Sequence, residues 1–123
     1  MKSDFGISFH GYNENVLTFE CTGDVQRGSL VTMDSSQKVR VAKDGECFLG
    51  VALGVRDGFA AVQLQGYCEL KADEDIPVGR TRLVASRFGR VKSRYEGIDV
   101  WVVAVGETEN EDGIGEDWIG VLI

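Results

Sequence analysis

The chain has 123 residues, 43% hydrophobic and 27% charged, which is the composition of one soluble globular domain. Sixteen glycines against one proline are unlike collagen, coiled coil or disordered low-complexity sequence. The formal net charge of -7 repels phosphate backbones and anionic lipids, so we expect neither nucleic acid nor membrane as a partner.

The amino-acid sequence also predicts the location of the protein and the state of its thiols. No apolar run approaches the roughly 20 residues that span a bilayer, and no signal peptide follows Met1, which predicts a cytoplasmic protein. Cys21, Cys47 and Cys68 include no Cys-x-x-Cys pair, and His10 is the single histidine. We therefore expect reduced, buried thiols, with no metal site and no cofactor.

The N-terminal segment, residues 1–15, is polar and interrupted by glycine. Within it Phe5, Ile7 and Phe9 alternate with polar or small residues, which predicts a short strand with one apolar edge. Such a segment is either an arm that adds a strand to an exposed sheet edge of another subunit, or the ordinary first strand of the fold. Residues 16–123 are expected to form a single β domain.

Apolar residues after this segment recur with period two, the pattern of half-buried strands. The pattern occupies residues 17–21, 38–41, 61–70 and 90–92. The run over 61–70 is the longest and predicts one continuous strand. Residues 48–55 and 100–105 are apolar at successive positions, which predicts central strands covered on both faces. Asp57-Gly58, between two strong strands, is the best hairpin signal.

These elements predict an all-β fold, a small barrel or sandwich of about eight to ten short antiparallel strands. A pattern near Gly28, Lys38 and Gly50 recurs about fifty residues later, and both duplication and convergence of β-rich sequence explain such a repeat. The inward positions of the strands form the predicted core: Leu17, Phe19, Val31, Val39, Val41, Leu49, Val51, Leu53, Val62, Leu64, Leu83, Val91, Val103, Val105, Ile119 and Val121.

Charge is unevenly distributed in the last third of the chain. Six basic residues and no acid lie between Arg80 and Arg94, and eight acids and no base lie from Glu96 onward. The two interpretations are solvated outer strand faces and a charge-matched surface for another protein. In the second, guanidinium groups bind carboxylates of a partner, and the binding residues are Arg82, Arg87, Arg90 and Arg94.

No catalytic constellation is present in the sequence, so we expect no enzyme. A nucleophile-base site would rest wholly on His10, and no phosphate-binding or nucleophile-elbow motif occurs. The acidic residues of 107–117 do not have EF-hand spacing, which favours a solvated loop over a cation site. Trp101 and Trp118 lie in apolar strands and are expected in the core, which argues against a sugar site.

Several short motifs nevertheless resemble those of one known family. Gly23-Asp24-Val25, the Gly-Val-Ala of residues 50–52 and the strand from Gly66 to Leu70 are similar to the plan of small phage head-decoration proteins, also called capsid cement proteins. The second half adds similar motifs at residues 75–79, 89–91 and 119–123. The resemblance covers most of residues 16–123, through motifs that are common among β-barrels.

The resemblance implies a non-enzymatic protein that docks on the outer face of an assembled phage capsid, often as trimers, and clamps neighbouring major capsid proteins. Its location would be the virion surface, and the host bacterial cytoplasm during assembly. The apolar residues of the N-terminal segment and the four arginines would then contact the capsid protein or a neighbouring subunit. The alternative function is a stand-alone β-barrel that binds a sugar or another small molecule.

Overall fold

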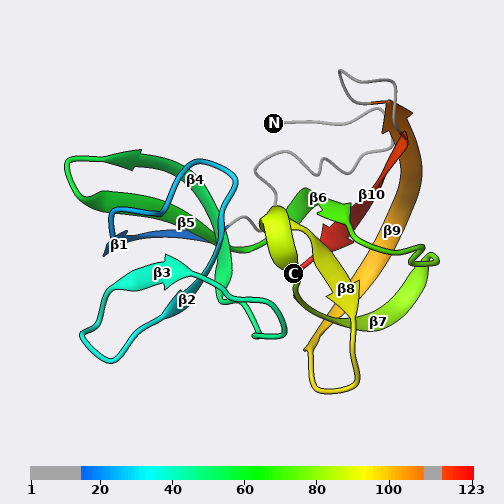
Figure 1. Ribbon diagram of the computed structural model, residues 1–123, viewed down its shortest axis with the longest axis horizontal. Coiled ribbons are helices and arrows are strands. Elements are labelled where there is room, and N and C mark those ends of the chain that lie inside the picture. The colour runs from blue at the N-terminus through cyan, green and yellow to red at the C-terminus, as the bar shows by residue number, and fades with distance from the viewer. Residues whose placement is uncertain (1–14, 110–114) are drawn as a thin grey trace.

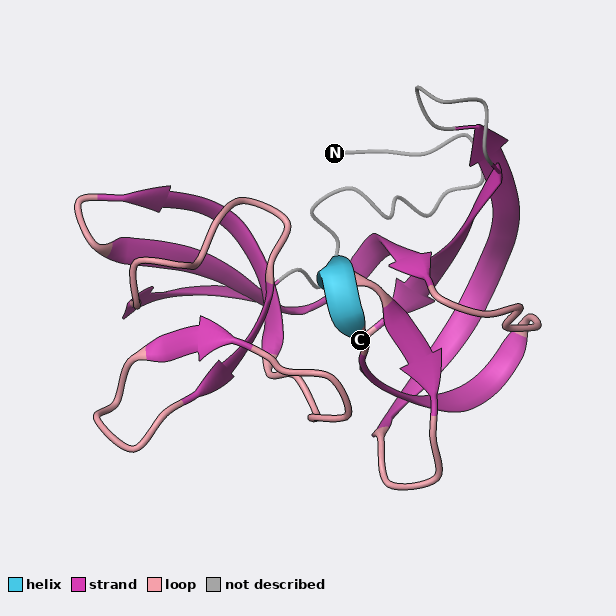
Figure 2. Ribbon diagram, viewed as in Figure 1, coloured by secondary structure: helices cyan, strands magenta, loops and turns pink. Residues whose placement is uncertain are grey.

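The computed structural model describes residues 15–109 and 115–123. The predicted all-β fold is confirmed, and the described residues form ten strands and one 3-10 turn, η1 (Arg87–Gly89). Figure 2 shows strands throughout and η1 between the two halves of the fold. No helix among the described residues is long and apolar enough to cross a membrane.

The strands form two groups of five, which lie side by side in Figure 1. The first unit is a sheet in the order β1-β5-β4-β2-β3, and the second unit is a closed barrel in the order β10-β6-β8-β7-β9. The bounds are β1 Asn15–Glu20, β2 Leu30–Met33, β3 Val39–Val41, β4 Gly50–Arg56, β5 Phe59–Gln65, β6 Tyr67–Ala72, β7 Gly79–Ala85, β8 Val91–Ser93, β9 Ile98–Glu109 and β10 Gly115–Leu122.

The two units have the same topology. In each, the first strand pairs with the fifth, the fifth with the fourth, the fourth with the second and the second with the third, all antiparallel. A parallel contact then joins the first strand to the third, through Cys21 and Val39 in the first unit and through Ala72 and Val91 in the second. The sequence repeat of about fifty residues thus has a structural counterpart.

Irregular features recur in both units as well. The fourth strand is bulged against the fifth, between Ala52 and Gly54 in β4 and opposite Gly120 and Val121 in β9. Asp34 and Ser86 close equivalent hairpin loops by donating their N–H groups to carbonyls four residues later, at 2.8 and 2.7 Å. Shared bulges and loops are hard to explain by convergence of strand composition, so we favour duplication of one five-stranded unit.

The β4–β5 hairpin confirms the prediction at Asp57-Gly58. Both residues have positive φ, 53° and 82°, as a two-residue type I′ turn requires. The prediction of one strand over 61–70 is wrong. Gly66 has a φ of 107°, which ends β5 and starts β6 in the other unit. Alternation of apolar residues continues across this glycine, although the backbone changes direction there.

The hydrophobic core is in two parts, and one of them joins the units. A cluster around Val31, Val39 and Val62 fills the first unit. The larger cluster fills the barrel and includes residues of the first unit, among them Phe48. Backbone hydrogen bonds reinforce this contact, because the Gly45 N–H donates to the Ala85 carbonyl and the Ala85 N–H donates to Glu46, both at 2.8 Å.

Burial confirms half of the predicted core and corrects the rest. Val31, Val39, Val51, Val62, Leu83, Val91, Ile119 and Val121 are buried, and Phe19, Val41 and Leu64 are half-buried. The exposed ones, contrary to prediction, are Leu17, Leu49, Leu53, Val103 and Val105. β4 and β9 are central in their sheets, but they are not covered on both faces. Strands of such small units have one interior face, and within residues 15–109 and 115–123 no second layer covers their outer face.

The loop that carries Gly45 is fixed by a charged hydrogen-bond network. Both guanidinium Nη atoms of Arg40 donate to Glu46, at 2.8 Å each, and the Lys43 N–H donates to the same carboxylate. These donors, Arg40 first, lower the pKa of Glu46 from 4.5 to about 2. A lowered carboxyl pKa stabilises the fold above the unfolded value and loses that contribution as pH falls through the folded value.

We therefore expect Glu46→Gln to destabilise the protein more at about pH 6 than at about pH 2. As pH falls from about 6 to about 2, the wild type should lose the stability that the ionised Glu46 carboxylate contributes. The variant has no carboxylate at this position, so it should lack this part of the pH dependence. Urea unfolding of both proteins across this range measures the difference. A constant gap between wild type and variant would contradict the assigned role of the Arg40–Glu46 pair.

Candidate protein-docking surface

The predicted N-terminal contacts, Phe5, Ile7 and Phe9, lie outside the described residues. The described chain begins at Asn15, the first residue of β1. β1 is an edge strand of the first unit, paired on one side with β5. It is exposed along most of its length, and Leu17 is 51% exposed. The first unit thus ends on an apolar strand edge that could pair with another chain.

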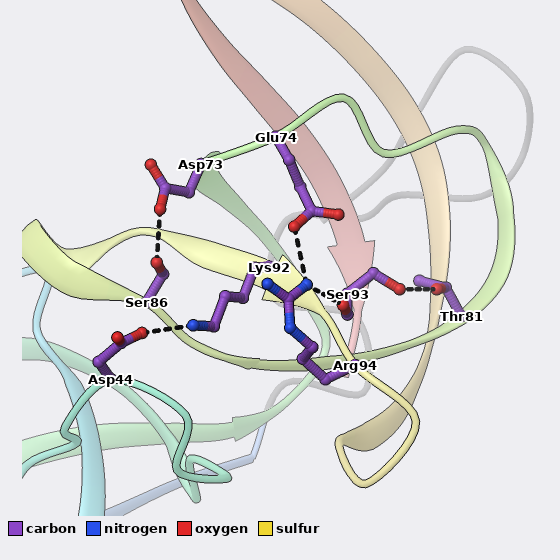
Figure 3. A network of polar contacts seen from close by, with 8 residues as sticks. All are labelled: Asp44, Asp73, Glu74, Thr81, Ser86, Lys92, Ser93 and Arg94. Atoms are coloured by element: carbon purple, nitrogen blue, oxygen red, sulfur yellow. Dashed lines mark hydrogen bonds and ion pairs between the residues drawn. The ribbon is translucent and has the colours of Figure 1, made fainter.

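The basic stretch from Arg80 to Arg94 is mostly paired within the chain. Arg80 binds Asp99 at 2.6 Å, Arg90 lies 3.1 Å from Glu116, and Arg94 lies 2.9 Å from Glu74. Figure 3 shows Arg94 with Glu74, Lys92 with Asp44, and the Ser86 hydroxyl donating to Asp73. The hydrogen bond from the Ser86 hydroxyl is the main cause of the lowered pKa of Asp73, and the nearby basic residues lower this pKa further. These pairs neutralise much of the charge that sequence analysis assigned to a partner.

Arg82 and Arg87 form no ion pair with another described residue. Arg82 donates to the Tyr95 carbonyl at 3.0 Å, and its guanidinium lies 5.1 Å from the centroid of the Tyr95 ring. Arg87 opens η1 and is exposed, next to Phe88, which is 84% exposed and has a φ of 62°. Of the four predicted arginines, these two are the ones available to a partner's carboxylates.

Two further expectations from the sequence need correction. The predicted loop over 107–117 is shorter, because β9 extends to Glu109 and β10 starts at Gly115, with residues 110–114 outside the described part.

Cys47 is exposed rather than buried, and its thiol donates to the Glu96 carbonyl at 3.3 Å. Cys21 is buried, and burial raises the pKa of the half-buried Cys68 to about 12. No metal-ligating cluster is found among the described residues.

An exposed apolar surface of the first unit lies at the β4–β5 hairpin, which Figure 1 shows at the end farthest from the barrel. Val55 is 41% exposed and Phe59 is 49% exposed. They border an open depression of about 610 Å³, which we name the distal hairpin surface and which is lined by Thr18, Gly54, Val55, Arg56, Asp57, Phe59 and Ala61.

Charged groups surround this apolar centre. Arg56 and Asp57 at the turn are almost fully exposed and form a long ion pair of 3.8 Å. Glu20 pairs with Phe59 across β1 and β5. An apolar centre with a polar, solvent-accessible rim is the usual anatomy of a protein-protein contact. The sequence pattern does not indicate this surface, because the continuous apolar run over residues 48–55 predicts a strand covered on both faces.

A second exposed surface, which we name the aromatic face, lies on the outside of the barrel. It consists of Tyr67, Trp101, Trp118 and Leu122, with Gly106 and Gly120 between them. Trp101 is 55% exposed and Trp118 is half-buried, so the expectation that both lie in the core is wrong. Their strands are apolar because one face of each fills the barrel, while the tryptophans point outward.

Comparison with known proteins identifies no relative of this chain. No family model matches the chain, and no curated protein is similar to it.

Proposed function

We propose that this protein is a non-enzymatic structural protein that binds the outer face of an assembled phage capsid shell through its distal hairpin surface. The observation that carries the proposal is the exposure of Val55 and Phe59 at the tip of the first unit, within a charged rim. Large exposed apolar side chains are costly for solubility unless a partner covers them. The major capsid protein is the proposed partner, and the virion surface is the proposed location.

A shell built from many identical subunits suits a docking surface of this small size. An open depression with two large apolar residues offers a small contact, and small contacts are weak one at a time. A capsid presents many identical sites, and association of this chain with itself, as a trimer for example, would join several such contacts. Linked contacts bind much more tightly than each alone. The capsid resemblance of the sequence motifs supports the same partner.

The other predicted contacts remain predictions. Phe5, Ile7 and Phe9 would add a strand at a sheet edge of a neighbouring subunit or of the capsid protein, and Arg82 and Arg87 would bind its carboxylates. Arg90 and Arg94 are less suited to that role, because each already pairs with a carboxylate of this chain.

Replacing both Val55 and Phe59 by serine should reduce binding to capsids that lack the protein by about tenfold or more, because central apolar anchors dominate interface energy. Co-sedimentation with such capsids measures the bound fraction. Val78→Ser is the matched control, since Val78 is 60% exposed but precedes β7 in the other unit. Wild-type protein that fails to sediment would refute the capsid function, while an equal loss in the control would refute the choice of surface.

A further inference from the structure

The barrel is open at the end where β9 and β10 extend beyond β7. Pairing of β7 with β9 stops at Val102, whereas β9 continues against β10 as far as Glu109. Val105 pairs with Ile119, and paired residues of neighbouring strands point to the same side of a sheet. Ile119 is 1% exposed and belongs to the core of the barrel, yet Val105 is 48% exposed. The interior face of these two strands is therefore open to solvent at this end of the barrel.

Carboxylates surround this opening. Glu107 and Asp117 form the next pair on the same face, and Asp75 reaches the opening from the segment between β6 and β7. We name the opening the acidic mouth. It has a volume of about 250 Å³, and the side chains that matter for its chemistry are Asp75, Ile76, Val105, Glu107, Asp117 and Trp118.

The charge of the acidic mouth is not balanced within the chain. None of its three carboxylates forms an ion pair with another described residue. No basic residue is found among the described residues that line it. The mouth thus combines an apolar floor with an anionic rim, which suits an apolar group that carries a positive charge beside it.

The side chains of Arg87 and Phe88, which we name the η1 tip, have this chemistry. Phe88 is 84% exposed and has a φ of 62°, a left-handed conformation that bulky residues rarely adopt. Strained backbone of this kind is typical of functional positions. Arg87 is exposed and forms no ion pair with another described residue. An apolar ring and an unpaired guanidinium are therefore exposed at adjacent positions.

The first unit shows that the fold does not require these two side chains. The loop that Asp34 closes in the first unit is equivalent to the loop that Ser86 closes in the second, with the same hydrogen bond across its ends. Residues 35 and 36, both serines, occupy there the places of Arg87 and Phe88. Because two serines are enough to form this loop, its folding does not explain an exposed arginine and phenylalanine.

We propose that the η1 tip of one copy of this chain binds in the acidic mouth of a second copy. The Phe88 ring would lie on the apolar floor beside Trp118, and Arg87 would pair with the carboxylates of the rim. A cavity of about 150 Å³ holds benzene, so a depression of about 250 Å³ has room for a phenyl ring.

The contact joins two copies and does not form within one. Phe88 is 84% exposed in its own chain, and Figure 2 shows η1 on the side of the barrel next to the first unit, away from the far ends of β9 and β10. Because the tip and the mouth are different surfaces, the contact is head-to-tail, and successive copies form a ring if the rotation closes. This contact does not depend on the proposed capsid function.

The test is the association of the full chain without capsids. Sedimentation velocity between about 1 µM and about 1 mM should show wild-type protein associating as its concentration rises. Phe88→Ser and Glu107→Arg should each weaken this association by about tenfold or more, because one removes the ring and the other repels Arg87. Both residues are exposed, so neither substitution should unfold the chain.

An equimolar mixture of these two variants is the decisive measurement. Phe88→Ser keeps an intact acidic mouth and Glu107→Arg keeps an intact η1 tip, so the mixture should form a dimer with one of each and grow no further. Phe59→Ser, on the distal hairpin surface, is the matched control and should associate as the wild type does. Wild-type protein that is monomeric at every concentration would overturn the proposal, as would a mixture that forms no dimer.

Co-sedimentation with capsids that lack the protein separates the other occupant of the η1 tip. If the wild type is monomeric and Phe88→Ser loses capsid binding, the tip binds the capsid protein and the contact between copies is wrong. Wild-type protein that associates with itself but does not sediment with capsids would instead refute the capsid function and leave this contact standing.

Discussion

Truncating Leu83 to alanine should lower the free energy of unfolding by about 2–5 kcal/mol, the cost of removing a fully enclosed leucine. Leu83 has no exposed surface and belongs to the cluster that fills the barrel and reaches into the first unit. It pairs with Ser93 on β8 and with Ile98 on β9, so the lost methyl groups would leave a cavity among three strands. Urea unfolding of wild type and variant measures the change.

Leu53→Ala is the matched control, because it makes the same chemical change in a strand at the surface. Leu53 falls at the β-bulge of β4 and is 41% exposed, so its truncation should cost less than about 1 kcal/mol. Similar losses for the two variants would show that the exposed face of β4 is buried in solution. A change of the denaturant slope would point to association through that face, since it alters the surface exposed on unfolding.

Leu53 also shows where sequence reasoning stops. Period-two alternation predicted an all-β fold correctly, and Asp57-Gly58 predicted its hairpin, because both signals depend only on neighbouring residues. The run Ala52-Leu53-Gly54 has no such alternation, and continuous apolar sequence was interpreted as burial on two faces. In the structure a bulge places an extra residue there, and the same occurs at Val103 in β9. Apolar runs in both halves thus mark bulges with an exposed residue.

The division into two units was also beyond the local pattern. Leu64 and Cys68 continue the alternation on both sides of Gly66, so composition alone indicates one strand. The positive φ of Gly66 separates β5 from β6, and only pairing with distant strands decides where each belongs. The repeat of about fifty residues was the available signal for two units, because equivalent strands lie that far apart in the chain.

The candidate surfaces were only partly predictable for a similar reason. The basic stretch was recognised correctly as a charge block, but Arg90 pairs with Glu116, twenty-six positions away, and Arg80 with Asp99. Such pairs depend on strand register, and the number and order of charges in the sequence carry no information about register. Exposure of Phe59 and Trp101 depends in turn on which face of each strand lacks a covering layer. The surface proposed to bind the capsid could therefore be identified only from the fold.

Gly97→Ala should be strongly destabilising, although Gly97 has no positive φ. A Cβ at this position would lie 2.5 Å from the Leu83 carbonyl oxygen and within 2.7 Å of the carbonyl carbon and amide nitrogen of the same residue. These are backbone atoms of β7, which pairs with β8 and β9 on its two sides and cannot move without breaking one ladder. We expect a loss of about 1–3 kcal/mol or more.

Gly54→Ala provides the comparison, because nothing lies within 4 Å of a Cβ at Gly54 and its φ is not positive. It should leave stability nearly unchanged or raise it slightly by restricting the unfolded chain. Thermal unfolding of the two variants separates a close approach of backbones from a general effect of adding a methyl group. If Gly97→Ala melts like Gly54→Ala, the β8–β9 loop does not pass across β7 at this distance, and the closed packing of the barrel around Leu83 would be wrong at that edge.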